Sequence, residues 1–372
     1  MSLGILVYVY FIFIVILLAT SKFRNKPVRK KEILPSISLI ICAYNEEKHI
    51  RKKIENCLEL DYPKDQMEII VVSDGSTDCT NAILNDMNHP LIKTHCLPER
   101  SGKTACQNVA VDLSSNDVLF FTDATILHPP NALKLLLRSL YDPSVGCVTG
   151  KPIFNRDEGL TSKGLSKRET YELYLRSQLS GINSLFGATD CMYAIPRQHY
   201  CPVRPDLDSG FVGPLKVLEK GYRTVYEPEA LALVARPAPT MNDEFIRRSR
   251  IVLRGMRGLL HMRSLMNPFK YGFLALSLIS TRLLRWLTPV FLFLLLMSNV
   301  FLLDSPFYQF TFLLQVGFYL AAFTAFLLER KGYKLGSVFC IPLYFCILAG
   351  SAAVGLKRLL TGETGQTWQT RR

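Results

Sequence analysis

The stretch that decides the fold is ISLIICAYNEEKHIRKKIENCLEL, residues 37–60. Its first seven residues are almost all apolar, the pattern of a strand buried on both faces, and the remainder mixes charged and apolar residues as an amphipathic helix does. The same order of strand and helix recurs in EIIVVS and STDCTNAILNDM, in LIKTHCL and GKTACQNVAVDL, and in DVLFFTD and PNALKLLLRSLY. The repetition predicts an α/β domain with a mostly parallel sheet and helices on both faces.

Beyond residue 150 the alternation is less regular. KRETYELYLRSQLS and GFVGPLKVLEKG are typical of helices, whereas GATDCMYAI and YRTVYEP are typical of strands. We find no internal repeat and no low-complexity segment in the 372 residues. We therefore expect a single large domain in the middle of the chain.

Long apolar runs lie outside this domain. The strongest are residues 3–19, 288–303 and 310–328, and a weaker one is 338–356. The first run has no basic residue before it and SKFRNKPVRKK directly after it, which indicates an uncleaved anchor with the central domain on the cytoplasmic side. The alternative is a cleaved signal peptide. We expect 288–303 and 310–328 to cross the membrane, and the last run to be re-entrant or interfacial.

These patterns divide the chain into five parts. They are an N-terminal transmembrane anchor (1–21), a cytoplasmic α/β domain (32–240), amphipathic or interfacial helices (241–286), a C-terminal transmembrane region (287–356) and a basic tail (357–372).

The net charge of +13 is concentrated beside the apolar runs. Such placement favours anionic lipid headgroups as partners and argues against nucleic acid. The ten cysteines contain no CxxC pair, which suggests neither a zinc site nor a disulfide framework. The sequence thus indicates an integral membrane protein of the cell membrane with several crossings.

Polar residues follow three of the predicted strands directly. Tyr44, Asn45 and Glu46 follow the first, Asp74 ends the second, and Asp123 ends the fourth. Because parallel strands present their carboxyl ends at one edge of a sheet, these groups are expected to form one ligand site. The simpler alternative is that Asn45 and the residues after Asp74 only cap helices and make turns.

The tripeptide GKT at residues 102–104 is not a complete phosphate loop, because Leu97 stands where that motif needs a glycine. Lys103 could still meet a phosphate at the start of a helix, where backbone N–H groups favour anions. The alternative is a solvated lysine.

The ordered set of segments is more specific than any one of them. ICAYNEE, VVSDGSTD, ERSGKTACQNVA and FFTDAT, followed by VGCVTG, GATDCMYAI and GFVGPLKVLEKGYRTVYEPEALA, resemble the family 2 glycosyltransferases with the GT-A fold over most of the chain. The resemblance implies binding of a nucleotide-diphosphate sugar. It places nucleotide contacts at Tyr44, Asn45, Glu46 and Asp74, and Lys103 near the pyrophosphate.

Asp123 matches the first acid of the family's Asp-x-Asp motif, which implies that it holds a divalent cation, Mg²⁺ or Mn²⁺, against the diphosphate of the donor. Thr125 stands at the position of the second acid. A hard cation keeps one or two carboxylates together with phosphate oxygens and water. The Thr125 hydroxyl could therefore complete the shell directly or through water.

The family supplies its catalytic base from an Asp just before a helix, and here Gly210 occupies that position. Asp208 lies two residues earlier, about 7 Å away in an extended chain and on the same side. Asp208 is therefore the base candidate. The alternative is that Asp208 only caps the following helix.

Processive members of the family carry Gln-x-x-Arg-Trp, whereas RRSRI at residues 247–251 lacks the Gln and the Trp. Arg250 is expected to bind the diphosphate, because a guanidinium matches phosphate oxygens. The surrounding segment RRSRIVLRGMRGLLHMR also has the pattern of an amphipathic helix on a membrane surface.

The prediction is a membrane-bound hexosyltransferase that acts with inversion in polysaccharide or glycolipid synthesis. We expect a UDP-sugar as donor and a lipid-linked or glycan acceptor. The alternative is a catalytically degenerate transferase that serves as a nucleotide-sugar-binding scaffold or regulator. A polytopic transporter fits poorly with so large a polar centre.

Overall fold

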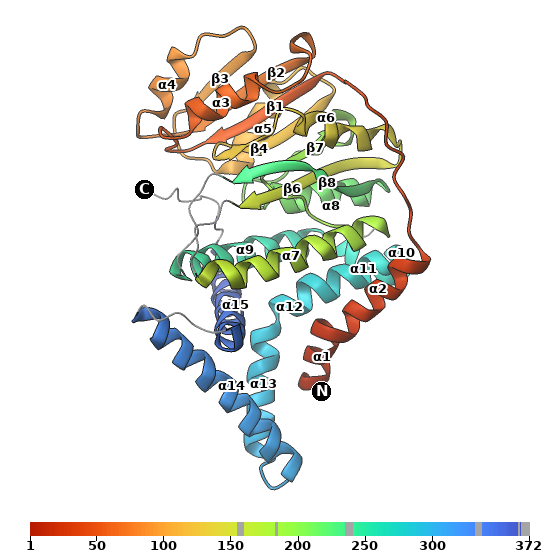
Figure 1. Ribbon diagram of the computed structural model, residues 1–372, viewed down its shortest axis with the longest axis vertical. Coiled ribbons are helices and arrows are strands. Elements are labelled where there is room, and N and C mark those ends of the chain that lie inside the picture. Colours follow the sequence, from red (N-terminus) through yellow and green to blue (C-terminus); the bar gives the residue numbers. More distant parts are fainter. Residues whose placement is uncertain (155–159, 183–184, 235–240, 332–336, 364, 366–372) are drawn as a thin grey trace.

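A computed structural model describes residues 1–154, 160–182, 185–234, 241–331, 337–363 and 365. Figure 1 shows a layered α/β domain at one end and a group of helices at the other, with the long helices α7 and α9 between them. The predicted fold class is confirmed for the sheet domain, and the apolar helices lie at the two ends of the chain as expected.

The sheet has eight strands in the order β3-β2-β1-β4-β7-β6-β8-β5. Strands β3, β2, β1 and β4 are parallel, as predicted. The second half is mixed, because β7 is antiparallel to both β4 and β6, while β8 is parallel to β6. The strands are β1 Ile37–Ala43, β2 Met67–Asp74, β3 Ile92–Leu97, β4 Val118–Asp123, β5 Ile126–Leu127, β6 Val145–Phe154, β7 Tyr193–Pro196 and β8 Arg223–Val234.

Helices cover both faces of this sheet. Alternate residues of β1 point to opposite sides, so that Leu39 packs with α3 and Ile40 with α5 in two separate cores. The helices of the domain are α3 Ile50–Leu58, α4 Thr80–Asp86, α5 Lys103–Leu113, α6 Ala132–Leu137, α7 Leu160–Gly181, α8 Ser209–Glu219 and α9 Met241–His261. All seven residues of β1 are buried, which explains its unbroken apolar sequence.

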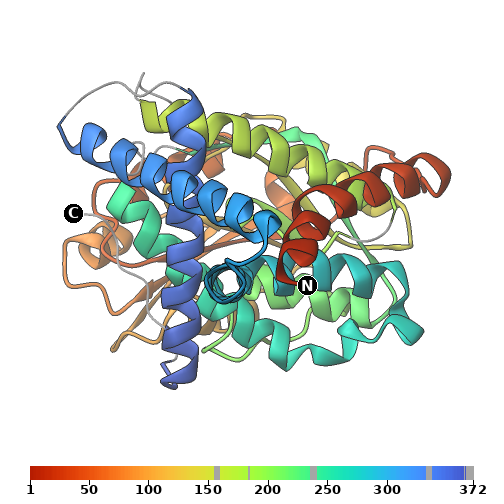
Figure 2. The same cartoon turned by 90° about the horizontal axis from the view of Figure 1, so that it is seen from below.

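A third core joins the sheet domain to the membrane-type helices. Phe13 and Leu17 of the N-terminal helix pack there with Leu175 of α7, Phe211 of α8 and Met256 of α9. Figure 2 shows these helices from below, crossing one another beneath the sheet. The remaining helices are α1 Ser2–Val7, α2 Phe13–Phe23, α10 Pro268–Tyr271, α11 Phe273–Leu278, α12 Leu284–Trp286, α13 Thr288–Phe301, α14 Pro306–Arg330 and α15 Ser337–Leu360.

Three helices of the described chain are long and apolar enough to cross a membrane: Ser2–Phe23, Pro306–Arg330 and Cys340–Leu360. The expectation that residues 288–303 cross the membrane stays a prediction, because α13 by itself has 14 residues and is about 21 Å long, shorter than a bilayer core. It reaches the required length only together with Phe273–Trp286, across a bend of 62°.

Helix α15 differs from α13 and α14 in direction. Figures 1 and 2 show α13 and α14 extending away from the sheet, whereas α15 runs across the underside of the domain. Its small residues allow close contact with α9, since a Cβ on Gly355 would lie 2.8 Å from the Ser249 carbonyl oxygen. Helix α15 is long enough to cross a membrane. The re-entrant or interfacial placement of residues 338–356 stays a prediction. The basic tail lies almost wholly outside the described residues.

Candidate functional site

The loops after β1 and β2 are fastened together at the carboxyl edge of the sheet. Asn45 has a left-handed backbone (φ 53°), and its side-chain Oδ1 accepts a hydrogen bond from the Thr77 N–H at 2.8 Å. The Asn45 N–H donates to Ser76 Oγ at 3.1 Å. These bonds give Asn45 a role in shaping the two loops. Its contact with a nucleotide stays a prediction.

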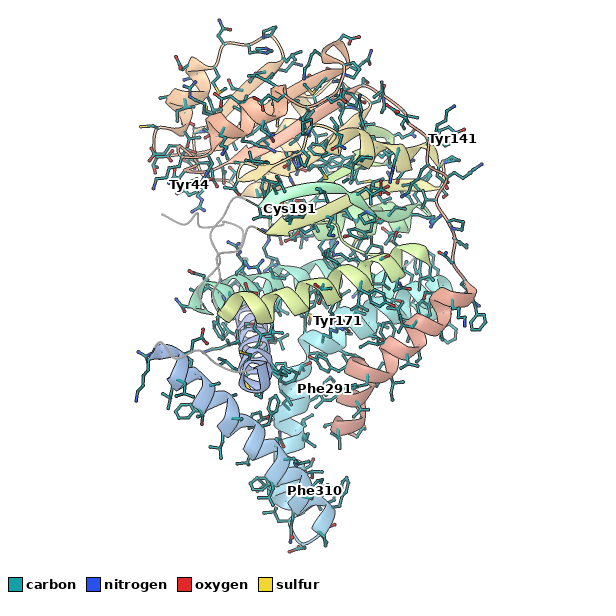
Figure 3. The ribbon with its side chains drawn as sticks, viewed as in Figure 1. Tyr44, Tyr141, Tyr171, Cys191, Phe291 and Phe310 are labelled. Atoms are coloured by element: carbon teal, nitrogen blue, oxygen red, sulfur yellow. The ribbon has the colours of Figure 1, made fainter. Side chains whose placement is uncertain are left out.

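Tyr44 and Glu46 flank Asn45. The guanidinium of Arg100, from the loop after β3, lies over the Tyr44 ring at 3.7 Å from its centre. Glu46 is buried (6% exposed), and its N–H donates to Thr80 Oγ1 at 2.9 Å. Figure 3 places Tyr44 and Tyr141 on opposite sides of the sheet domain, with Cys191 between them. Because Tyr44 directly follows β1, the stacked pair of Tyr44 and Arg100 lies at the predicted edge.

Asp74 is fully buried at the end of β2. Its Oδ1 accepts hydrogen bonds from the Ser101 N–H (2.6 Å) and the Gly102 N–H (3.1 Å), and its Oδ2 accepts from the Gly102 N–H at 3.0 Å. The carboxylate thus holds the loop that leads into α5 and sets the position of Lys103. A direct contact of Asp74 with a nucleotide also stays a prediction.

Lys103 joins two carboxylates from different strands. Its Nζ lies 2.6 Å from Asp123 Oδ1 and 3.5 Å from Asp190 Oδ1. Burial alone would lower the pKa of Lys103, but the charges of Asp123 and Asp190 outweigh it and raise that pKa. For Asp190, burial together with the charges of Asp208 and Asp123 raises the pKa to about 6 despite the nearby Lys103. The site therefore carries more negative charge than one lysine balances.

Asp208 is the N-cap of α8. Its Oδ1 accepts a hydrogen bond from the Phe211 N–H at 3.2 Å, and its backbone is extended. The helix-cap alternative from the sequence is thus what the structure shows for this side chain. Gly210 lies in the first turn of α8, where a Cβ would be 2.3 Å from Asp190 Oδ1.

Two arginines of α9 approach the same carboxylates. Arg254 Nη2 donates to the Leu207 carbonyl at 2.6 Å and to Thr104 Oγ1 at 3.2 Å, which ties α9 to α5 and to the chain before α8. Burial and the charge of Arg254 lower the pKa of Arg250, while the carboxylates of Asp208 and Asp190 act in the opposite sense. The apolar face of α9 packs against α8 and α15, and the interfacial placement of residues 241–286 stays a prediction.

The structure brings together Lys103, Asp123, Asp208 and Arg250 of the predicted set, and places Tyr44, Asn45, Glu46 and Asp74 in the adjoining loops. The sequence reasoning missed Asp190 and Arg254. Asp190 lies in the segment GATDCMYAI, three residues before the buried strand β7, whereas Asp123 was identified as an acid that ends a strand.

The donor set suits a hard cation. The ammonium of Lys103 already lies between two carboxylates, which shows that this spot favours positive charge. No group of three His, Cys, Asp or Glu side chains that could hold a metal occurs in the part of the chain that the structure describes. Thr125 is buried (4% exposed) in the turn after Asp123. A divalent ion here would need oxygens from a bound ligand, as Mg²⁺ commonly does.

Comparison with known proteins agrees with this geometry. The model of the family described as glycosyl transferase family 2 matches residues 38–199. The chain is 34% identical to the probable glycosyltransferase YdaM of Bacillus subtilis (strain 168) over 136 residues, which are 34% of this chain and 32% of that protein. It is 26% identical to the poly-beta-1,6-N-acetyl-D-glucosamine synthase of Staphylococcus aureus (strain COL), over 58% of this chain and 53% of that protein. The matches thus span about a third to a half of these relatives.

Among solved structures, the mannosyltransferase PcManGT from Pyrobaculum calidifontis, in complex with GDP-Man and Mn²⁺, matches with a TM-score of 0.71. The identity is 19%, and the match covers 96% of this chain and 97% of that one, so the likeness shows the fold, membrane-type helices included. Fold, family model and curated relatives agree: residues 38–199 match glycosyl transferase family 2, and the chain has the GT-A fold.

Proposed function

We propose that the protein transfers a sugar, with inversion, from a nucleotide-diphosphate sugar to a hydroxyl group of a lipid-linked or glycan acceptor. The observation that carries this proposal is the cluster of Lys103, Asp123 and Asp190 at the carboxyl edge of a GT-A sheet. A partly exposed, negatively charged cluster with one cation of its own is suited to a second cation and a diphosphate.

In this proposal the loops around Tyr44, Asn45, Glu46 and Asp74 hold the nucleoside. Asp123 would ligate Mg²⁺ or Mn²⁺ together with diphosphate oxygens. When bound, the cation would neutralise the charge that builds up on the departing diphosphate. Lys103 and Arg250 would face the phosphates from two sides, because both carry their positive charge into this site.

The helices beneath the sheet support a membrane-delivered acceptor. Three described helices are long and apolar enough to cross a membrane, and the third core packs the N-terminal helix directly against α7. We propose an integral protein of the cell membrane with the GT-A domain on the cytoplasmic side. The basic segment after the first helix supports this orientation.

The donor is open to direct test. A UDP-sugar is the first expectation, and GDP-mannose belongs in the same panel because the solved structural neighbour holds GDP-Man. Purified protein in detergent is incubated with UDP-glucose, UDP-N-acetylglucosamine and GDP-mannose, with and without Mn²⁺, and release of nucleoside diphosphate is measured. Mn²⁺-dependent release from one donor that is lost in Asp123→Ala supports the proposal. Equal release by Asp123→Ala contradicts the role of Asp123.

The second candidate, a non-catalytic nucleotide-sugar-binding scaffold, rests on Gly210, which has no side chain to act as a base. The same donors distinguish the two functions. A scaffold stabilises on donor binding but releases no nucleoside diphosphate. A simple Gly210→Asp rescue is not informative, because the new Cβ would clash with Asp190 Oδ1.

A further inference from the structure

We propose that Asp190 is the base that receives the proton of the acceptor hydroxyl. The inference rests on the proposed transfer function and identifies a residue that the family resemblance does not assign. Three observations carry it: the place of its carboxylate beside Gly210, the occupation of the other carboxylates, and the rigidity of the turn on which it lies.

The carboxylate of Asp190 fills the space that a side chain at position 210 would need. An ideal Cβ on Gly210 would lie 2.3 Å from Asp190 Oδ1 and 3.2 Å from its Cγ. The two segments are fixed to each other, because the Ala188 N–H donates to the Gly210 carbonyl at 2.8 Å. A side chain at position 210 and the carboxylate of Asp190 therefore exclude each other, and the absence of the first makes room for the second.

The other two carboxylates of the site are already in use. Asp123 is paired with Lys103 at 2.6 Å, and Asp208 caps α8 through the Phe211 N–H. Asp190 Oδ1 is buried and forms no hydrogen bond with any residue that the structure describes, and its distance of 3.5 Å to Lys103 is long. The Asp190 side chain as a whole is 41% exposed to solvent. One side of the carboxylate thus remains open to an incoming hydroxyl group.

The turn that presents Asp190 is firmly held. Asp190 and Cys191 form the tip of a tight turn closed by the bridge between Thr189 and Met192, whose N–H donates to the Thr189 carbonyl at 3.1 Å. Thr149 of β6 braces both sides, since its Oγ1 accepts from the Thr189 N–H and donates to the Met192 carbonyl, each at 3.0 Å. A base held in this way needs no reorganisation to act.

The chemical step balances without a further reactant. The acceptor oxygen attacks the anomeric carbon and forms the new C–O bond, while the bond from that carbon to the diphosphate oxygen breaks and its electron pair leaves on the nucleoside diphosphate. The proton of the acceptor hydroxyl goes to the Asp190 carboxylate and afterwards to water. The positive charges of Lys103 and Arg254 partly offset the burial and the like charges that raise the pKa of Asp190.

The test uses the full chain in detergent with Mn²⁺, water as acceptor, and whichever of UDP-glucose, UDP-N-acetylglucosamine and GDP-mannose the wild type hydrolyses. We expect Asp190→Asn to lower kcat at least about 100-fold with the donor KM within about 3-fold, as loss of a general base does. The matched control is Asp117→Asn, the same chemical change at the far edge of the sheet, where Asp117 accepts from Ser36 Oγ.

A second pair of variants moves the base. Gly210→Asp alone should be impaired by the clash, and Asp190→Ala should be impaired by loss of the carboxylate. The double variant Asp190→Ala/Gly210→Asp should recover at least about 10-fold over Asp190→Ala, because removal of the first carboxylate makes room for the second. Recovery of this kind does not follow from a merely structural role of Asp190.

The outcomes separate the two proposals. If the wild type hydrolyses no donor, the transfer function fails and this inference with it. If the wild type is active and Asp190→Asn keeps its kcat, or Asp208→Asn is the more damaged variant, only the inference fails. Loss of Mn²⁺-dependent donor binding in Asp190→Asn, measured by calorimetry, would overturn it too, because Asp190 would then be a metal ligand.

Discussion

Glu68 and Asp190 are carboxylates at opposite ends of the same sheet. Glu68, at the start of β2, accepts hydrogen bonds from Ser38 Oγ, from the Ser115 N–H at 2.7 Å and from Lys93 Nζ at 2.7 Å. Asp190, before β7, shares one lysine with Asp123 and leaves Oδ1 without a hydrogen bond in the described chain. The first carboxylate is fully satisfied, and the second is not.

Their pKa values move in opposite directions for this reason. Burial would raise the pKa of Glu68, but Lys93, Ser115 and Ser38 outweigh it and lower the value to about 2. Burial and like charges raise the pKa of Asp190 to about 6. The contrast teaches that the carboxylate at one edge of the sheet stabilises the fold, whereas the carboxylate at the other edge costs stability, as is expected of a binding site.

The largest expected effect lies at the ligand edge. Asp123→Ala should lower donor turnover at least about 1000-fold, because the site loses its principal oxygen ligand for the cation. The measurement is release of nucleoside diphosphate by purified protein. Glu68→Gln serves as the comparison and should keep its kcat, since Glu68 lies at the other edge. Equal losses in both variants would break the contrast between the two edges.

At the satisfied edge, Glu68→Gln should destabilise the fold by about 1–3 kcal/mol, the cost of leaving buried partners without their acceptor. In a domain of this size that corresponds to a fall in apparent Tm of several degrees, measured by thermal unfolding in detergent. An unchanged Tm would show that the hydrogen bonds of Glu68 add nothing to stability.

The variant Glu68→Gln also tests how the stability that Glu68 contributes depends on pH. Because the folded pKa of Glu68 (about 2) is below its ordinary value of 4.5, its contribution is complete above pH 4.5 and is lost as the pH falls toward 2. The difference in Tm between wild type and Glu68→Gln should therefore shrink on acidification. A difference that stays constant through this range would contradict the assignment.

Asp190 should behave in the opposite way. Its folded pKa of about 6 is above the ordinary 3.8, so its charge destabilises the fold above pH 6, and this cost disappears as the pH falls toward 3.8. Asp190→Asn should raise the Tm at neutral pH by a few degrees. A lower Tm in that variant would show that Asp190 is structural in the same sense as Glu68.

A smaller effect is expected at the helix cap. Asp208→Ala should cost about 1 kcal/mol, whereas Asp208→Asn should cost little, because Asn is an equally good N-cap. The two values of Tm check this. Equal destabilisation by Asn and Ala would indicate that the negative charge of Asp208, and not its cap, is what matters.

The sequence predicted the framework better than the site. Strands β1, β2 and β4 could be located because burial on both faces leaves unbroken apolar runs that end on polar residues. The antiparallel placement of β7 could not, since it depends on pairing between segments about 70 residues apart. The same limit hid the hydrogen bonds from the Ser101 and Gly102 N–H groups to the Asp74 carboxylate, whereas the nucleotide contact of Asp74 stays a prediction.

The contact between Asp190 and Gly210 likewise depends on the folded structure and is not visible in the sequence. Each residue looks ordinary alone, and only their contact shows that one occupies the space of the other. The bend of 62° between Phe273–Trp286 and α13 was not predicted, because an apolar composition does not reveal where a helix bends.

The central claim is that the carboxyl edge of the sheet binds a nucleotide-diphosphate sugar together with a divalent cation. The most direct measurement is the thermal shift of wild type and Asp123→Ala with UDP-glucose, UDP-N-acetylglucosamine and GDP-mannose, each with and without Mn²⁺. We predict that one donor stabilises the wild type only with Mn²⁺, by mass action, and that Asp123→Ala loses this shift. Absence of any Mn²⁺-dependent shift in the wild type, or an equal shift in Asp123→Ala, would contradict the claim.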